Sequence, residues 1–316
     1  MTVTAETVIQ ASALVVRYGA TEAVRGVTLA VRRGEVVGLI GPDGAGKTSV
    51  LRVMAGLHPA SEGSVTVVGE DAWRSRRALH AHLGYLPQRF ALYGDLTVAE
   101  NMQFFALLLG VPEWRPRRDE LLRRVGLDRF RDRQADHLSG GMRQKLALAV
   151  SLMHAPGILL LDESTTGVDP VTRREFWRLL ADLVADGLTL VLATPYLDEA
   201  ERCSRVVLMH RGEILGEGSP QHLTELVPGT MLEVAAEPRG PALDALRGMQ
   251  GVVEVQQFSA RFHVRLASGA TAEQIRGALS GAGVIIHEVR AVAPRLEDTF
   301  LHLTRAAQRR ATGVIP

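Results

Sequence analysis

The sequence predicts an α/β fold: a parallel sheet with helices on its faces, an antiparallel β subdomain, an inserted helical subdomain and a small α+β domain. Short β-branched strands alternate with helical stretches through the first two thirds of the chain, as in parallel α/β architecture. Turn residues at Val227-Pro228-Gly229 then mark a boundary, and the pattern beyond it changes. We therefore predict one domain over 1–227 with a helical insertion at about 89–156, a second over 228–308, and a tail over 309–316.

The elements of the first domain follow from apolar periodicity and from Gly, Pro and charged turns. Strands are predicted at 13–16, 27–31, 36–40, 65–68, 83–87, 158–161, 188–193, 206–210 and 214–217. Helices are predicted around 51–57, 98–125, after Ser139, and at 171–186 and 196–203. The helix over 171–186 is followed by Gly187, which suits a C-terminal cap.

The second domain shows a strand, helix, strand, strand, helix, strand order. These elements are predicted at 231–235, 242–249, 252–258, 262–266, 272–282 and 284–289. That order predicts a ferredoxin-like sandwich. A last helix is expected over 296–306, before the tail.

Composition narrows the class of protein. The 316 residues are 46% hydrophobic, enough for a buried core, and 36 basic residues face 35 acidic ones. A net charge of +1 gives no electrostatic reason to expect a nucleic-acid partner. The single cysteine, Cys203, excludes an internal disulfide and fits a reducing cytoplasm. Neither a secretory signal nor an apolar run of membrane-spanning length is visible, so we expect a soluble chain whose membrane role, if any, comes through a partner.

The segment Gly41-Pro42-Asp43-Gly44-Ala45-Gly46-Lys47-Thr48 fits the phosphate-loop pattern G-x-x-x-x-G-K-[ST], between a predicted strand and a predicted helix. Its glycines let backbone N–H groups close around phosphate oxygens, and the next helix presents its positive end to them. Lys47 would bring a point charge to the outer phosphates, and the hydroxyl of Thr48 would bind Mg²⁺.

Two adjacent acids follow the apolar strand Ile158-Leu159-Leu160-Leu161. The carboxyl end of such a strand is where α/β sheets bind ligands. Asp162 would hold Mg²⁺, and Glu163 would polarise the attacking water. Acid pairs are also common in surface turns, and it is the position after a strand of the same inferred sheet that favours the functional interpretation.

A third pattern, Leu138-Ser139-Gly140-Gly141-Met142-Arg143-Gln144, opens a helix. It offers free N–H groups and a hydroxyl to an anion. An ordinary Ser N-cap followed by glycines has the same appearance, and spacing alone does not decide between the two.

Together these motifs resemble the ABC ATPases, over about residues 8–220. LSGGMRQ looks like the family signature, GPDGAGKT like its Walker A loop and ILLLDE like its Walker B strand. Gln88 in GYLPQ resembles the Q-loop, Asp169 in TTGVDP the D-loop, and Tyr18 in VRYGA the aromatic that stacks on adenine. The ending PRLEDTFLHLT resembles that of drug- and antibiotic-exporter ATPases.

The resemblance implies an ATP- and Mg²⁺-dependent motor with two half-sites per chain. ATP would bind the Walker A loop of one subunit, including Ser49, and the Ser139–Met142 loop of another. Thr48, Asp162 and Gln88 would serve Mg²⁺, while Glu163, Lys47 and Gln88 would act in hydrolysis. The expected partners are a second ABC ATPase subunit, identical or different, and a polytopic permease docked on the helical subdomain. The chain would then lie in the cytoplasm, peripheral to the inner face of the membrane.

Three positions depart from the family pattern. Asp43 replaces the usual Asn, Ser164 the usual Pro, and Pro195 the usual His that contacts the γ-phosphate. Proline has neither a side-chain donor nor an N–H, although it suits the first turn of a helix. We therefore expect slow hydrolysis, or dependence on an intact site in a partner subunit.

Two alternatives to an export motor remain open. One is a hydrolysis-deficient regulatory subunit, which Pro195 favours and Glu163 disfavours. The other is a soluble ABC ATPase acting on the ribosome or in DNA repair. Only 92 residues separate Lys47 from Ser139 (139 − 47), room for the helical subdomain but not for a long coiled coil.

Overall fold

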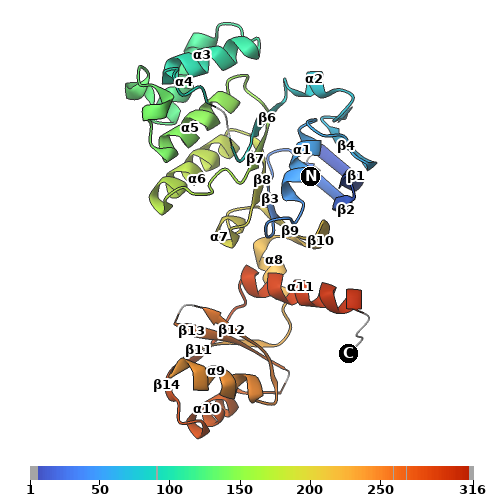
Figure 1. Ribbon diagram of the computed structural model, residues 1–316, viewed down its shortest axis with the longest axis vertical. Coiled ribbons are helices and arrows are strands. Elements are labelled where there is room, and N and C mark those ends of the chain that lie inside the picture. The colour runs from blue at the N-terminus through green and yellow to red at the C-terminus, as the bar shows by residue number, and fades with distance from the viewer. Residues whose placement is uncertain (1–5, 90–91, 259, 268, 313–316) are drawn as a thin grey trace, which may run out of the picture. The chain divides into compact units, whose positions relative to one another are not determined.

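The computed structural model describes residues 6–89, 92–258, 260–267 and 269–312, in two compact units, Met1–Ser219 and Pro220–Pro316 (Figure 1). The division falls before the predicted boundary at residue 227. The reason is α8 (Pro220–Glu225), which packs on α11 (Leu296–Thr312) of the second unit. There the Thr299 hydroxyl donates to the Leu223 carbonyl at 3.1 Å.

The central sheet of the first unit has six strands in the order β10-β9-β3-β8-β7-β6. All neighbours are parallel except β10, which pairs antiparallel with β9, so the predicted parallel sheet is confirmed. The strands are β3 (Val36–Ile40), β6 (Leu83–Leu86), β7 (Ile158–Asp162), β8 (Thr189–Thr194), β9 (Arg205–His210) and β10 (Glu213–Gly218). Because β3, β7 and β6 run the same way, the loops after them meet at one edge.

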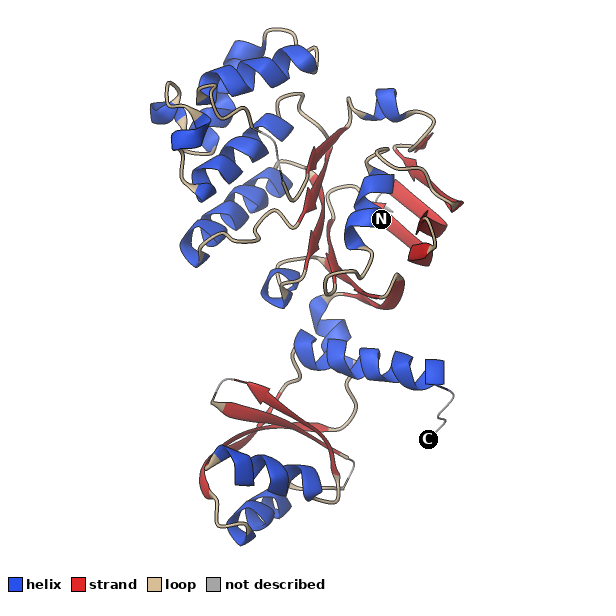
Figure 2. Ribbon diagram, viewed as in Figure 1, coloured by secondary structure: helices blue, strands red, loops and turns tan. Residues whose placement is uncertain are grey.

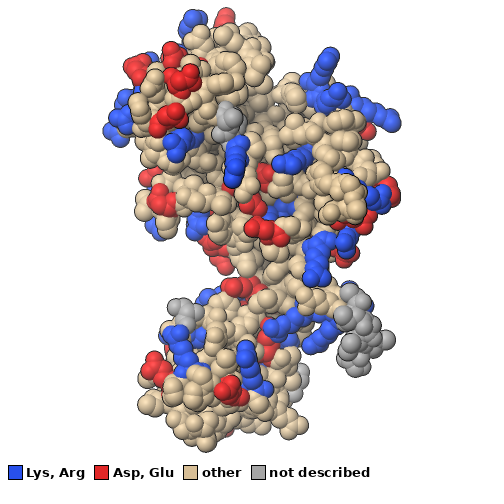
Figure 3. All heavy atoms as spheres, in the orientation of Figure 1, with Lys and Arg blue, Asp and Glu red and all other residues tan. Residues whose placement is uncertain are grey.

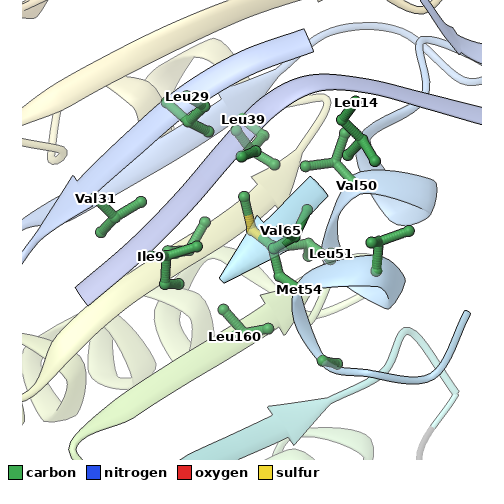
Figure 4. Close-up of a cluster of buried hydrophobic side chains, with 14 of the residues drawn as sticks. Ile9, Leu14, Leu29, Val31, Leu39, Val50, Leu51, Met54, Val65 and Leu160 are labelled. Carbon is green, nitrogen blue, oxygen red and sulfur yellow. The ribbon is translucent and has the colours of Figure 1, made fainter. Parts of the chain in front are cut away.

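An antiparallel sheet lies across α1 (Lys47–Met54) from the central sheet (Figure 1). Its order is β2-β1-β4-β5, with β1 (Thr7–Tyr18), β2 (Thr21–Arg32), β4 (Glu62–Val67) and β5 (Glu70–Asp71). Figure 4 shows the core between them, with Leu29 and Val65 from this sheet, Leu51 and Met54 from α1, and Leu160 from β7. Burying each such side chain stabilises the fold by about 1.5–3 kcal/mol, so this core fixes α1.

Helices α3 (Val98–Leu108), α4 (Trp114–Arg124) and α5 (Gly140–Ser151) form the inserted subdomain between β6 and β7, beside α6 (Pro170–Ala185) (Figure 2). Thr97 and Glu100 close a capping box at the start of α3. The helix predicted over 98–125 is two helices, because the chain turns at Gly110 with φ 65°.

Two short α-helices and two 3₁₀ turns, η1 (Asp128–Phe130) and η2 (Ala135–His137), complete the described part of the first unit. The sequence analysis did not predict α2 (Arg76–Leu79), and α7 (Leu197–Ala200) is shorter than the predicted helix over 196–203. In the described part of the chain, no helix is both long and apolar enough to cross a bilayer.

The second unit has a four-stranded antiparallel sheet in the order β12-β13-β11-β14, which confirms the ferredoxin-like topology. Its strands are β11 (Thr230–Glu237), β12 (Val252–Phe258), β13 (Arg261–Leu266) and β14 (Ile285–Val292). Helices α9 (Arg239–Gly248) and α10 (Ala272–Gly281) pack on the sheet around Val234, Phe262 and Leu279.

Helix α11 continues to Thr312, so the predicted tail is wrong for residues 309–312. It is anchored by an ion pair from Arg305 to Glu254 at 2.7 Å and by a contact of 3.3 Å between Asp298 Oδ1 and His263 Nδ1. Arg309 and Arg310 in the last turn suit the negative end of the helix dipole. Residues 313–316 of the predicted tail lie outside the described residues.

Candidate functional site

The phosphate-binding loop joins β3 to α1. Gly44 and Gly46 adopt φ values of 76° and 100°, a region that side chains rarely enter. A Cβ on Gly46 would lie 2.5 Å from the Ala23 carbonyl oxygen, and one on Gly41 only 2.2 Å from that of Met209. The close approaches at Gly41 and Gly46 therefore require glycine, and the positive φ at Gly44 favours it.

A cavity of about 350 Å³ lies over this loop. It is lined by the loop and the residues that face it: Ala23, Asp43, Gly44, Ala45, Gly46, Lys47, Thr48, Ser49, Gln88 and Glu163. Segments far apart in sequence thus meet at the edge where β3, β6 and β7 end, as predicted from parallel strands.

Lys47 lies at the base of this cavity with only 3% of its side chain exposed. Its Nζ donates to the carbonyls of Gly41 at 2.7 Å and Pro42 at 3.1 Å, and pairs with Glu163 Oε1 at 3.2 Å. Phosphate oxygens can replace the Glu163 carboxylate as a partner of the Lys47 ammonium group. Lys47 is therefore placed to bind phosphate.

Asp162 ends β7 and is buried. Its Oδ1 accepts from the Thr48 hydroxyl at 2.8 Å, and its Oδ2 from the Tyr85 hydroxyl at 3.2 Å. A carboxylate and a hydroxyl beside a phosphate cavity are the hard oxygen ligands that Mg²⁺ prefers, so these residues fit the ion. Burial, and then the Asp162 charge, raise the pKa of Tyr85 and keep its phenol protonated as a donor.

Glu163 follows with φ 49°, unusual for a residue with a side chain. Its N–H donates to the Ala193 carbonyl at 2.9 Å, which fixes this turn on β8. The Gln88 amide donates to Glu163 Oε2 at 3.1 Å. Gln88 therefore contacts Glu163, the residue predicted to polarise water, rather than Asp162.

The signature residues lie elsewhere. Ser139 caps α5, its hydroxyl accepting from the Met142 N–H at 3.3 Å, and a Cβ on Gly141 would lie 2.3 Å from Thr172 Cγ2 on α6. Asp169 caps α6 through the Val171 and Thr172 N–H groups, and the bonds with Thr172 lower the pKa of its carboxyl. In the described part of the chain, none of Ser139, Gly140, Gly141 and Met142 lines the phosphate-loop cavity.

Tyr18 ends β1, outside the cavity lining. It is 39% exposed, and its ring lies 4.8 Å from that of His58 at an interplanar angle of 55°. An exposed aromatic ring can stack on a planar ligand, and the role of Tyr18 toward adenine stays a prediction.

Pro195 follows β8 and precedes α7, which begins at Leu197. Pro195 thus lies just outside this helix, because Tyr196 is the N-cap residue. The guanidinium of Arg173 lies 5.2 Å from the centre of the Tyr196 ring and pairs with Asp198 at 3.1 Å. The Tyr196 ring is therefore packed against Arg173 of α6.

Comparison with known proteins identifies the family. Residues 24–166 match the family described as "ABC transporter". The daunorubicin resistance ATP-binding protein DrrA2 of Streptomyces coeruleorubidus is 36% identical over 304 residues, which cover 94% of each chain. The chain belongs to the ABC transporter ATP-binding proteins. The probable multidrug ABC transporter ATP-binding protein YbhF of Escherichia coli is 40% identical over 285 residues. That match covers 88% of this ABC chain but only 48% of YbhF, so the chain spans about half of that relative's length.

Solved structures agree. An ATP-binding subunit of an ABC transporter superposes with a TM-score of 0.63 at 28% identity, covering 69% of this ABC chain and 92% of that one. A dimeric ATP-binding cassette in a post-hydrolysis state, bound to ADP and Pi, gives 0.61 at 27% identity, covering 67% and 98%. The fold predicted for the first domain is thereby confirmed.

The sequence analysis missed Tyr85 and Glu199. The buried Glu199 carboxylate on α7 accepts from the Thr165 hydroxyl at 2.6 Å and the Trp177 indole at 3.2 Å. It ties α7 to the segment between Glu163 and Asp169. Tyr85 stood in the GYLPQ motif beside Gln88, but only a tertiary contact shows that its hydroxyl reaches Asp162.

Proposed function

We propose that this chain is the ATPase subunit of an ABC exporter, coupling ATP binding and hydrolysis at a dimer seam to transport by a permease. The observation that carries the proposal is the cavity in which Lys47, Thr48, Gln88 and Glu163 converge. The relatives named for daunorubicin resistance and for probable multidrug transport support export of an organic compound.

The residues in and beside the cavity have distinct roles. Lys47 exchanges its bond to Glu163 for phosphate oxygens, and the freed carboxylate orients and deprotonates the attacking water. Gln88 stays within reach of the Glu163 carboxylate and aims it. Thr48 and Asp162 would hold Mg²⁺, which would supply charge neutralisation at the phosphates.

The ATP site is completed by a second chain. Ser139 and Gly140 lie exposed at the start of α5, with Met142 half-buried beside them. There they can meet the γ-phosphate held by a partner's Lys47. The Ser139 hydroxyl and the first N–H groups of α5 are donors of the kind that bind anions at helix N-termini. A post-hydrolysis dimer among the related structures supports this pairing.

The permease docks on the inserted helical subdomain. At the end of α3, Leu107 and Leu108 are 61% and 67% exposed, beside two adjoining cavities of about 600 and 230 Å³ that share His80 and His154. One is mostly apolar, and Arg77 and Arg117 line the other. This combination suits a short amphipathic cytoplasmic segment of the permease with an acidic residue. On the face shown in Figure 3, basic and acidic side chains are interspersed over both units.

Pro195 makes hydrolysis slow, or dependent on a partner with an intact site. It has no donor for the γ-phosphate, and Tyr196, the next residue, is packed against Arg173. The same feature supports a second candidate, a regulatory subunit that binds ATP without turning it over. Glu163, held in position by Gln88 and Lys47, favours the motor over that candidate.

The decisive experiment measures ATPase activity of the purified chain, alone and reconstituted with its permease. We expect low activity alone, an increase on Pro195→His, and loss on Glu163→Gln with ATP retained in a dimer. Activity indifferent to Glu163→Gln would contradict the motor, and high activity of the parent unchanged by Pro195→His would contradict the role given to Pro195.

A further inference from the structure

Tyr85 belongs to two environments at once. It lies on β6, next to β7, and its hydroxyl donates to Asp162 Oδ2 at 3.2 Å. The other oxygen of the same carboxylate accepts from Thr48 at 2.8 Å. The two hydroxyls thus hold both oxygens of the carboxylate that fits Mg²⁺, and fix its rotation.

The ring of Tyr85 lines the apolar cavity of about 230 Å³ between the α/β core and the helical subdomain. Ala55 and Leu57 contribute the core side of this cavity, and Phe105 and Leu108 the α3 side. A rigid aromatic side chain therefore spans the distance from the cavity wall to the metal-binding carboxylate. A displacement of the wall that tilts the ring also moves the hydroxyl, because the ring and its hydroxyl form one rigid plane in a packed interior.

The segment containing Tyr85 also contacts the second carboxylate, that of Glu163. Three residues on, Gln88 donates to Glu163 at 3.1 Å. The end of β6 and the residues after it thus touch both members of the Asp162-Glu163 pair. Of Tyr85 and Gln88, only Tyr85 also lines the apolar cavity.

We propose that Tyr85 is a positioning residue that orients Asp162 toward the metal and transmits occupation of the apolar cavity to the metal site. The proposal rests on the proposed function in assigning Mg²⁺ to Asp162. It goes further in giving the hydroxyl of Tyr85 the task of linking two sites that no other single described side chain is seen to join.

The first test separates the hydroxyl from the ring. Mn²⁺ affinity is measured by electron paramagnetic resonance with the non-hydrolysable analogue AMP-PNP, and analogue binding is measured separately in EDTA. Tyr85→Phe should weaken Mn²⁺ binding by about tenfold, as loss of an outer partner of a metal ligand does, and leave binding in EDTA unchanged. The matched control is Tyr93→Phe, which removes an equivalent hydroxyl from a residue outside the cavities.

Unchanged Mn²⁺ affinity in Tyr85→Phe would overturn the positioning role. This outcome differs from failure of the proposed function. If the proposed function fails, the parent protein itself binds neither AMP-PNP nor Mn²⁺. Retention of the ring keeps the packing of β6, so a folded variant is expected, and its melting temperature checks this.

The second test fills the cavity without a permease. A Leu108→Cys chain is labelled with a bulky maleimide, with Val253→Cys on β12 as the labelled control. Burial raises the pKa of Cys203 to about 12, so the native thiol does not compete. Labelling at 108 should shift Mn²⁺ affinity by about three- to tenfold, and not in the Tyr85→Phe background. An equal shift in both backgrounds, or none in either, would overturn the link.

Discussion

Two glycine-rich helix starts in this ABC chain have opposite surroundings. The start of α1 lies under a cavity, and Lys47 beside it is bonded on several sides. The start of α5 is exposed, and the Ser139 hydroxyl bonds to its own helix. One chain therefore brings the charged groups together over the phosphate loop, while the signature residues lie outside that cavity, as the proposed pairing with a second chain requires.

The difference lies in how the loops are positioned. Parallel strands deliver Gln88 and Glu163 to the phosphate loop from within the chain. The loop at Ser139 belongs to the inserted subdomain and is positioned by packing on α6, where Gly141 meets Thr172. A motif that offers hydrogen-bond donors to an anion therefore becomes part of a binding site only where the fold brings other groups to face it.

The largest effect is expected from Lys47→Ala. Removing the buried cation eliminates charge-assisted bonds to phosphate worth about 2–3 kcal/mol, so ATP affinity should fall about 30- to 150-fold and hydrolysis should be lost. Fluorescent-nucleotide titration and phosphate release measure both. Lys145→Ala, which breaks a surface pair with Glu175, is the matched control. Unaltered ATP affinity in Lys47→Ala would remove the basis for the whole site.

Mixing two inactive variants tests whether the halves come from different chains. Lys47→Ala damages the charged half, and Ser139→Arg blocks the signature half. A heterodimer of the two retains one intact site, and random pairing makes half of the dimers heterodimers. An equal mixture should therefore recover about a quarter of the parent's activity. Phosphate release is measured before and after mixing. A mixture as inactive as its components would show that the halves do not complement each other across chains.

A smaller effect is expected at the two signature glycines. A Cβ on Gly141 would meet Thr172 Cγ2 at 2.3 Å, so Gly141→Ala should destabilise the fold by about 1–3 kcal/mol. Gly140 has no atom within 4 Å of its would-be Cβ, and Gly140→Ala should be neutral or slightly stabilising. Urea unfolding measures both. Equal stabilities would mean that α5 is not held by this contact.

The smallest effect concerns Asp169, which caps α6. The Thr172 bonds lower its carboxyl pKa below the ordinary value of about 3.9, so the cap stabilises the fold above that value. That contribution should be lost as the pH falls through the lowered pKa. Asp169→Asn keeps a capping oxygen without a titrating group, so its stability should fall less between pH 5 and pH 2.5, as thermal unfolding would show. Parallel pH profiles for the two proteins would contradict this role.

Much of the site was predictable because its motifs are local. The Gly41–Thr48 loop has to be glycine-rich to follow its path, and the buried Ile158–Leu161 run has to be a strand that delivers Asp162 and Glu163. The boundary at Ser219, the extension of α11 and the hydroxyl of Tyr85 on Asp162 were not predictable. Each of these depends on a contact between segments far apart in sequence.

The sequence by itself determined the phosphate loop, most of the strands and helices, and the family, because these depend on short-range periodicity and on residue types at fixed spacing. Only the tertiary structure decided which motifs share a cavity. It placed Lys47 against Glu163 and left Ser139 exposed on another helix. The physical reason is that strand order and helix packing set distances across the fold, and sequence spacing does not encode those distances.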